Sequence, residues 1–244
     1  MMRVLVTAGG TRARVDDVRW IGNSSTGRFG ARIVRELLGR GAKVVHLASP
    51  QAEMPLARTI DFAGAWEDEL GQCREASSRW AEWATRYREE RFDTPDDYGE
   101  RLRELLRREA FDMVVLAAAV SDYAPMPTTG KISSREDELT LRLRRVPKFI
   151  AQARDWAPKA YLVGFKLLSG VAEEHLVDVA RDAGRANRVD VTVANDWRLL
   201  QSGCHTIHLV RDGEATETFS ERTVDIADRL VDRLWCWAEE KRRG

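Results

Sequence analysis

The stretch VLVTAGGTRARVDDVRWIGNSSTGRFG, from Val4 to Gly30, decides the fold. It opens with an apolar strand that runs into Gly9-Gly10-Thr11, as the strand of a nucleotide-binding strand–turn–helix unit does. A helix does not follow at once, because charged and β-branched residues intervene before a second small-residue turn at Asn23–Gly27. We therefore expect two polar turns to converge near the end of one strand.

Neither of the familiar glycine motifs fits this stretch. The pattern G-x-G-x-x-G is absent, which weighs against a dinucleotide site. Gly22 and Gly27 have the spacing of a P-loop, but Arg28 and Phe29 follow them instead of Lys and Ser or Thr. A phosphate-binding site here would have to be built in another way.

The two turns still offer groups that bind phosphate. Gly9 and Gly10 would let backbone amides approach an anion, and Ser24 or Ser25 would cap a helix over Ser25–Gly39. A helix N-terminus attracts negative charge because its first amides have no partner within the helix. A capped helix without any ligand explains the same residues equally well.

The composition limits the class of protein. The chain has 244 residues, of which 43% are hydrophobic, so we expect a single α/β domain over 1–244 with a sizeable core. The 39 basic and 39 acidic residues cancel, which gives no footprint for nucleic acid. We find no signal-peptide pattern and no apolar run long enough to span a bilayer. The spacing of the three cysteines suggests neither a disulfide nor a metal site. A cytoplasmic location without membrane contact is expected.

Apolar runs alternate with helical periodicity along the chain, which predicts a doubly wound, mostly parallel Rossmann-like sheet flanked by helices. The expected strands are short and β-branched, as buried strands are: Arg3–Thr7, Lys43–Ala48, Asp112–Ala117, Ala160–Phe165 and Asp190–Ala194. Beyond the first helix, we expect helices at Pro147–Trp156, Ala172–Asn187 and Glu221–Lys241, and two more between Ala65 and Glu109. Asp212-Gly213 predicts a C-terminal antiparallel edge hairpin of Thr206–Arg211 with Ala215–Phe219.

Two regions break this regular alternation. Residues 121–137 form a loop rich in Pro, Ser, Thr and Gly directly after a buried strand, where α/β proteins bind ligands. Residues 66–108 are highly charged and read as a helical insert. Trp80, Trp83 and Tyr87 have helical spacing there, which favours core or interface packing over a ligand site.

Polar residues that follow other strands are further candidates. Asp122 could accept from a hydroxyl or amide, help hold a metal, or simply form an Asx turn before Pro125. Lys131 is either a solvated loop lysine or a group that neutralises a departing pyrophosphate. Phe165 could stack on a base and Asn195 could bond to a sugar or phosphate, although both also suit ordinary strand ends. No Ser-His-Asp set, HExxH helix or Cys/His cluster appears, and metal ligands cannot be assigned.

Seven blocks of this sequence, in this order, resemble the phosphopantothenate–cysteine ligase family. They are VLVTAGGTR, VRWIGNSSTGRFG, AAAVSDY, GKISS, RRVPKFI, DWAPKAYLVGFKLL and VTVAND. The blocks KISS and VGFKLL are similar to those of the stand-alone ligases. Family members that are fused to a flavin decarboxylase carry KIKK and VGFAAET instead, so the resemblance implies no flavin here.

The resemblance implies a step of coenzyme A biosynthesis. A nucleoside triphosphate with Mg²⁺ activates the carboxylate of 4′-phosphopantothenate as an acyl-nucleotidylate, and the amine of cysteine then displaces the nucleoside monophosphate. Matching positions assign the triphosphate to Gly10, Ser25, Gly27 and Gly30, and the nucleoside to Phe165 and Asn195. The substrate pocket would comprise Asn23, on the acyl group, with Ala118, Ala119 and Asp122.

Two basic residues complete the implied site. Lys131 would close over the phosphates, and Arg19 would reach the substrate phosphate of a neighbouring subunit, which implies a homodimer. The lysines that bacterial fusion proteins carry before their AND motif are replaced here by Arg185 and Arg188, near the nucleotide. We expect CTP as the co-substrate, with ATP as the alternative.

Two other functions are compatible with the predicted architecture. An NAD(P)-dependent oxidoreductase of the short-chain dehydrogenase type would have a G-x-x-x-G-x-G turn and a Tyr-x-x-x-Lys pair, and we find neither. A non-catalytic nucleotide-binding relative of the ligase could use residues 66–108 to hold a partner. The presence of Asn23, Asp122 and Lys131 argues against this second alternative.

Overall fold

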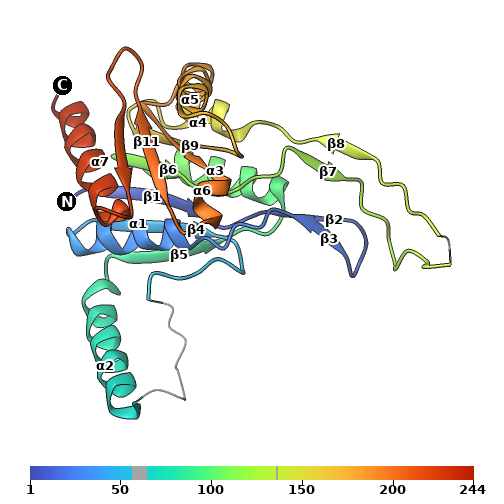
Figure 1. The fold of residues 1–244 in the computed structure, drawn as a ribbon. Coiled ribbons are helices and arrows are strands. Elements are labelled where there is room, and N and C mark those ends of the chain that lie inside the picture. The colour runs from blue at the N-terminus through green and yellow to red at the C-terminus, as the bar shows by residue number, and fades with distance from the viewer. Residues whose placement is uncertain (57–64, 136) are drawn as a thin grey trace.

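The computed structural model describes residues 1–56, 65–135 and 137–244. Within these ranges eight strands form one sheet in the order β12-β11-β10-β9-β6-β1-β4-β5 (Figure 1). The strands from β10 to β5 are parallel, and β11 and β12 add an antiparallel edge. Their bounds are β1 Arg3–Ala8, β4 Lys43–Ala48, β5 Tyr87–Arg91, β6 Met113–Leu116, β9 Tyr161–Leu168, β10 Val191–Asp196, β11 Thr206–Val210 and β12 Glu217–Ser220. The predicted fold class and edge hairpin are confirmed.

Helices cover both faces of this sheet because its central strands alternate between two buried faces. Val4 and Val6 of β1 pack with α1 (Arg28–Gly39) and α7 (Ile226–Arg243), whereas Leu5 packs with α3 (Pro95–Arg108) and α4 (Phe149–Trp156). Helix α5 (Glu173–Asn187) packs on β10 and β11. The short helix α6 (Trp197–Gln201) follows β10, and none of the described helices is long and apolar enough to cross a bilayer.

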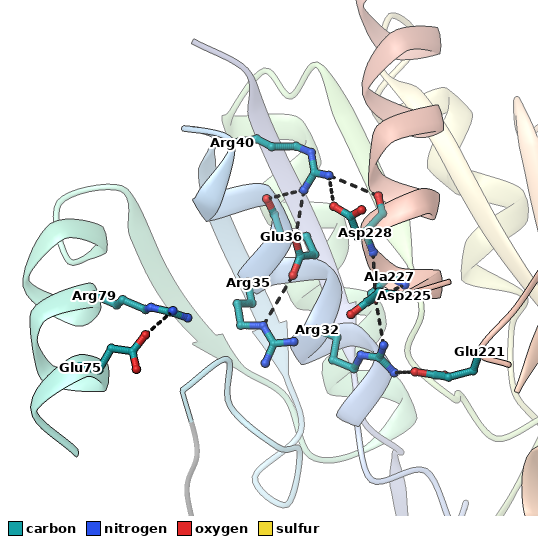
Figure 2. Close-up of polar contacts among 10 residues, drawn as sticks. All are labelled: Arg32, Arg35, Glu36, Arg40, Glu75, Arg79, Glu221, Asp225, Ala227 and Asp228. Carbon is teal, nitrogen blue, oxygen red and sulfur yellow. Dashed lines mark hydrogen bonds and ion pairs between the residues drawn. The ribbon is translucent and has the colours of Figure 1, made fainter. Parts of the chain in front are cut away.

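Ion pairs fasten the C-terminal helix to α1. Arg32 of α1 lies 2.7 Å from Glu221 and 3.0 Å from Asp225, the N-cap residue of α7. Arg40, at the C-terminal end of α1, contacts Asp228 and lies 2.6 Å from Asp232. Figure 2 shows Arg32 and Arg40 with Asp225 and Asp228 between the two helices. The apolar face of α7, which includes Ile226, Leu230 and Leu234, is fully buried beside this network.

The segment 66–108 is not a purely helical insert. It contains α2 (Trp66–Trp83), which stands away from the sheet in Figure 1, and α3, but the strand β5 lies between them and pairs in parallel with β4. Tyr87 therefore belongs to a strand and not to a helical stripe with Trp80 and Trp83. Trp83 is buried in the core as expected, while Trp80 is 45% exposed and packs its ring edge on Tyr87.

Two antiparallel ribbons project from the end of the sheet (Figure 1). One pairs β2 (Arg12–Arg14) with β3 (Trp20–Gly22), and the other pairs β7 (Tyr123–Pro125) with β8 (Leu143–Arg145). We call these ribbons, with the described residues that join each pair, the arm. The prediction that residues 121–137 form a loop is wrong at its start, because Tyr123–Pro125 is the strand β7. Its partner β8 lies about twenty residues further along the chain and carried no strand signal in the sequence.

A buried histidine makes the stability of this fold depend on pH. His46 of β4 lies with its Nδ1 3.1 Å from the Tyr87 hydroxyl, and its Nε2 has no partner among the described residues. Burial, with a smaller contribution from Arg91, lowers the pKa of His46 to about 4. An unfolded histidine titrates near 6.5, so the unfolded chain binds the proton that the folded chain excludes.

We expect the free energy of unfolding to show no loss from His46 above about pH 6.5, where the side chain is neutral in both states. It should then fall as the pH is lowered toward 4, because only the unfolded chain takes up the proton. The slope contributed by this one proton is about 1.4 kcal/mol per pH unit. Urea unfolding at several pH values should therefore show a steeper acid loss for the wild type than for His46→Gln, which does not titrate. Parallel curves for the two proteins would show that the folded chain binds the His46 proton as readily as the unfolded chain does.

Candidate functional site

The candidate site lies where β1 and β6 end. Past these strands the two chain segments stay paired: the amide of Ala119 donates to the Gly9 carbonyl at 2.8 Å, and the amide of Thr11 donates to the Ala119 carbonyl at 3.1 Å. The Thr11 hydroxyl extends the pairing by accepting from the amide of Ser121 at 3.0 Å. The glycine turn and the Ala118–Asp122 segment, predicted separately, are thus brought together.

Asn23 joins this corner from the second turn. Its Nδ2 donates to the Ala119 carbonyl at 2.9 Å, so both lone pairs of that oxygen are used, one by Thr11 and one by Asn23. A Cβ at position 10 would lie 2.8 Å from the backbone oxygen of Asn23, so Gly10 is required for this approach. The expected convergence of the two polar turns is confirmed, and the exposed Asn23 amide lies at its centre.

Helix α1 begins differently from the prediction. It starts at Arg28, its N-cap is Gly27 in the left-handed region at φ 72°, and no side chain caps it. The hydroxyl of Ser25 instead accepts from the Gly27 amide at 3.4 Å, so the expectation that Ser24 or Ser25 caps a helix starting at residue 25 is wrong. The amide of Arg28 donates to the Thr26 hydroxyl at 3.4 Å. Because no N-cap side chain fills the rest of the first turn, the amides after Arg28 stay available to an anion.

Close packing fixes this helix end against the strand. A Cβ at Gly30 would lie 2.6 Å from the Cβ of Ala8, and a Cβ at Gly27 would lie 2.7 Å from that of Ala52. The glycines assigned to the triphosphate therefore have a packing reason of their own. They also bring the amides at the start of α1 close to the Gly9 amide, since the Gly27 Cβ position is 3.2 Å from that nitrogen.

A cavity of about 140 Å³ opens on the other side of the Ala118–Asp122 segment. Ala118, Asp122 and Phe165 line it, as the sequence predicts for parts of one site. Lys148 also lines it and forms an ion pair with Asp122. Sequence reasoning missed Lys148, although the block RRVPKFI that contains it had been singled out.

An aromatic corner joins this cavity to α1. The rings of Phe29 and Phe165 lie edge to face with centroids 6.2 Å apart, and His205 packs its ring on Phe29 at 4.8 Å. Asn195 lies on β10 two residues beyond Val193, the register partner of Phe165, and on the same face of the sheet. Phe165 and Asn195 thus come from neighbouring strands at the same end of the sheet, as the prediction requires. No sequence signal pointed to the ring contacts of Phe29 and His205 beside them.

Arg19 and Lys131 lie elsewhere, at the far end of the β2–β3 ribbon. Its tip, residues 15–19, holds the segment 128–132: the amide of Gly130 donates to Asp17 and the amide of Ile132 donates to Asp16, both at 3.0 Å. The ribbon strands are three residues long, which separates this tip from Gly10 and Asn23 by roughly 10 Å. Both basic residues therefore lie on the arm, apart from the corner of Gly10 and Asn23.

Asp16 is the charged centre of this tip. Its carboxylate is buried and accepts from the Arg19 guanidinium at 2.6 Å. The hydrogen bond from Arg19, with others from the amides of Val18, Ile132 and Arg19, outweighs the effect of burial and holds the pKa of Asp16 well below its usual value. Among the described residues, no group of three His, Cys, Asp or Glu side chains is arranged to hold a metal ion.

The chain matches a known family over most of its length. Residues 1–66 and 98–236 match the model of the DNA/pantothenate metabolism flavoprotein C-terminal domain. The unmatched interval contains α2 and β5, so the part of the chain that departs from the family is shorter than the predicted insert of 66–108 and leaves out most of α3.

Two relatives define the likeness in sequence. The chain is 30% identical to human phosphopantothenate–cysteine ligase in an alignment that covers 95% of this chain and 84% of the human protein. It is 29% identical to the coenzyme A biosynthesis bifunctional protein CoaBC of Thermococcus kodakarensis, with 95% of this chain and 50% of that protein covered. The chain thus spans half the length of the bifunctional relative.

Solved structures show the same architecture. The DNA/pantothenate metabolism flavoprotein from Streptococcus pneumoniae aligns with a TM-score of 0.78 at 26% identity, covering 97% of this chain and 100% of that one. A Cab2 variant in complex with phosphopantothenate-cysteine aligns with a TM-score of 0.84 over 98% of this chain and 87% of that one, and at 21% identity this likeness shows the fold. The chain belongs to the DNA/pantothenate metabolism flavoprotein C-terminal domain family and, within it, to the phosphopantothenate–cysteine ligases.

Proposed function

We propose that this chain joins 4′-phosphopantothenate to L-cysteine in two steps. The substrate carboxylate attacks the α-phosphorus of a nucleoside triphosphate that arrives with Mg²⁺, and pyrophosphate leaves. The cysteine amine then forms an amide bond to the acyl carbon, the bond from that carbon to the nucleotide oxygen breaks, and the nucleoside monophosphate leaves while the amine proton passes to solvent. We expect CTP to serve better than ATP, and the reaction to occur in the cytoplasm.

The corner where Asn23 meets Gly10 and Ala119 is the observation that carries this proposal. An acyl transfer between two bound substrates requires no protein nucleophile, and its rate depends on positioning and on stabilising charge. Amides at the turn of Gly9 and Gly10 and at the start of α1 suit a triphosphate. One hydrogen of the Asn23 amide holds Ala119, and the second remains for the acyl oxygen of the intermediate.

The arm supports the proposed homodimer. Several large apolar side chains of the arm are exposed: Val18, Trp20, Ile21, Tyr123, Met126, Leu139 and Leu143. A patch of this kind marks a surface that a partner covers. A second copy of the chain would cover it while Arg19, at the tip, reaches the phosphate of the substrate bound to that copy.

The test is direct. The protein is incubated with phosphopantothenate, cysteine, MgCl₂ and either CTP or ATP, while pyrophosphate release and the mass of the condensed product are followed. We expect turnover with at least one nucleotide, and in the absence of cysteine a single burst of pyrophosphate equal to the active sites. Silence with both nucleotides, from protein that is folded by circular dichroism, would leave the non-catalytic alternative.

A further inference from the structure

Asp16 is a buried charged group that the proposed reaction does not use. Its side chain lies at the tip of the β2–β3 ribbon and the residue is 3% exposed. Oδ1 accepts from the amides of Val18 at 3.0 Å and Arg19 at 2.8 Å, while Oδ2 accepts from Arg19 Nε at 2.9 Å and from the amide of Ile132 at 3.0 Å. The carboxylate thus joins two segments that are more than a hundred residues apart in the sequence.

The ribbon tip holds the backbone on both sides of Lys131, through Asp16 and Arg19 on one side and Asp17 on the other. Following it, Ile132 donates its amide to Asp16 and accepts at its carbonyl from Arg19 Nη2 at 2.8 Å. Preceding it, Gly130 exchanges two hydrogen bonds with Asp17, one from its amide to the carboxylate at 3.0 Å and one to its carbonyl at 3.2 Å. The backbone on each side of Lys131 is fixed, while its own side chain is exposed to solvent.

The guanidinium of Arg19 is likewise oriented. It has five N–H groups, and three of them, on Nε and Nη2, donate to Asp16 and to the Ile132 carbonyl. In the described part of the chain, the two N–H groups of Nη1 have no protein acceptor. A phosphate approaching the tip would therefore meet a guanidinium with one edge fixed and the other edge free to donate.

We propose that Asp16 is a positioning residue that sets Arg19 and Lys131 as one rigid unit. The inference rests on the proposed function, in which Arg19 binds the substrate phosphate and Lys131 acts on the triphosphate. The Asp16 carboxylate then links the placement of both cations, so the group that recognises the acid substrate and the group that assists pyrophosphate departure stay fixed relative to one another on the arm. Asp16 itself touches neither substrate.

Kinetics separate this role from a general structural one. Asp16→Asn removes one anionic acceptor, and we expect it to raise the KM for phosphopantothenate in the same direction as Arg19→Ala and also to lower kcat, each by about 10-fold or more, as loss of outer-shell partners does at metal sites. Asp17→Asn is the matched control, because it weakens the contact to Gly130 and leaves every Arg19 contact in place. Its KM for phosphopantothenate should stay at the wild-type value.

The outcomes of these assays are distinct. If the wild type turns over and Asp16→Asn has the same KM and kcat as Asp17→Asn, the inference about Asp16 is overturned. The proposed function then still stands. A wild-type protein that is silent with both nucleotides would overturn the proposed function, and the inference with it.

A second readout needs no turnover. Trypsin cuts after Lys131, at the bond whose amide is held by Asp16, so Asp16→Asn should be cut there faster than the wild type, with an unchanged melting temperature because the tip lies outside the core. If Asp16→Asn does not fold, hydrogen exchange of the wild type decides: the amides of Arg19 and Ile132 should exchange more slowly than that of Lys131. Equal rates for these three amides would overturn the inference.

Discussion

Asn23→Asp is expected to slow amide formation by about 10²–10³-fold, the loss that follows removal of one donor from an oxyanion-type site. The wild-type amide donates one hydrogen to the Ala119 carbonyl at 2.9 Å, and the other is the one proposed to bond to the acyl group. An aspartate loses both donors and places its negative charge beside the Ala119 oxygen and the phosphates. The first half-reaction, which depends on the glycine turns, should be affected less than the second.

The variant should therefore accumulate the acyl-nucleotidylate. Rapid-quench assays with nucleotide labelled in the α-phosphate would show a pyrophosphate burst in the absence of cysteine, followed by slow conversion of the labelled intermediate when cysteine is added. Asn187→Asp is the matched control, because Nδ2 of Asn187 also donates to a backbone carbonyl, that of Ala183 at 2.8 Å. Asn187 ends α5 just before the start of β10, so it lies at the end of the sheet opposite to the glycine turn, and the expected place of its neighbours Arg185 and Arg188 near the nucleotide is wrong. Normal cysteine-dependent turnover of Asn23→Asp would show that its role is wrongly assigned.

The sequence predicted the central strands well because burial on both faces leaves an apolar run with clear ends. Lys43–Ala48 was predicted to the residue, and each of the other predicted sheet strands differs by a few residues at its ends. β5 was missed because its sequence is Tyr-Arg-Glu-Glu-Arg. An edge strand has one neighbour and keeps charged side chains in solvent, so its composition does not distinguish it from a polar helix.

The residues that lie at strand ends could be predicted from the sheet topology, whereas those on the arm could not. Parallel strands end at one edge of a sheet, so Gly10, Asn23 and Ala119 could be expected to meet. Lys131 could not be placed, because its position depends on the contacts of Asp16 and Asp17 with a segment distant in the sequence. Local propensity carries no information about such a contact.

Lys131→Gln is expected to reduce the rate of pyrophosphate release by about 10²–10³-fold, since it removes a positive charge that is proposed to neutralise the leaving group. The backbone contacts on either side of Lys131 do not involve its side chain, so the arm should stay intact and the KM for phosphopantothenate should change little. Lys131→Arg, which keeps the charge, should recover most of the rate. The measurement is the pre-steady-state pyrophosphate burst without cysteine, which isolates the first half-reaction.

Lys43→Gln controls for the loss of any surface charge. Lys43 is an exposed lysine in register with Arg3 at the start of the sheet, the end opposite to the glycine turn, and its removal should leave the burst unchanged. The three-residue strands of the ribbon set its tip roughly 10 Å from Gly10, so movement of the arm or presentation by a partner subunit would bring Lys131 onto the triphosphate. A slowed burst in Lys131→Gln that Lys131→Arg restores would establish that such an approach occurs during turnover, and an unaffected burst would confine the lysine to the surface of the arm.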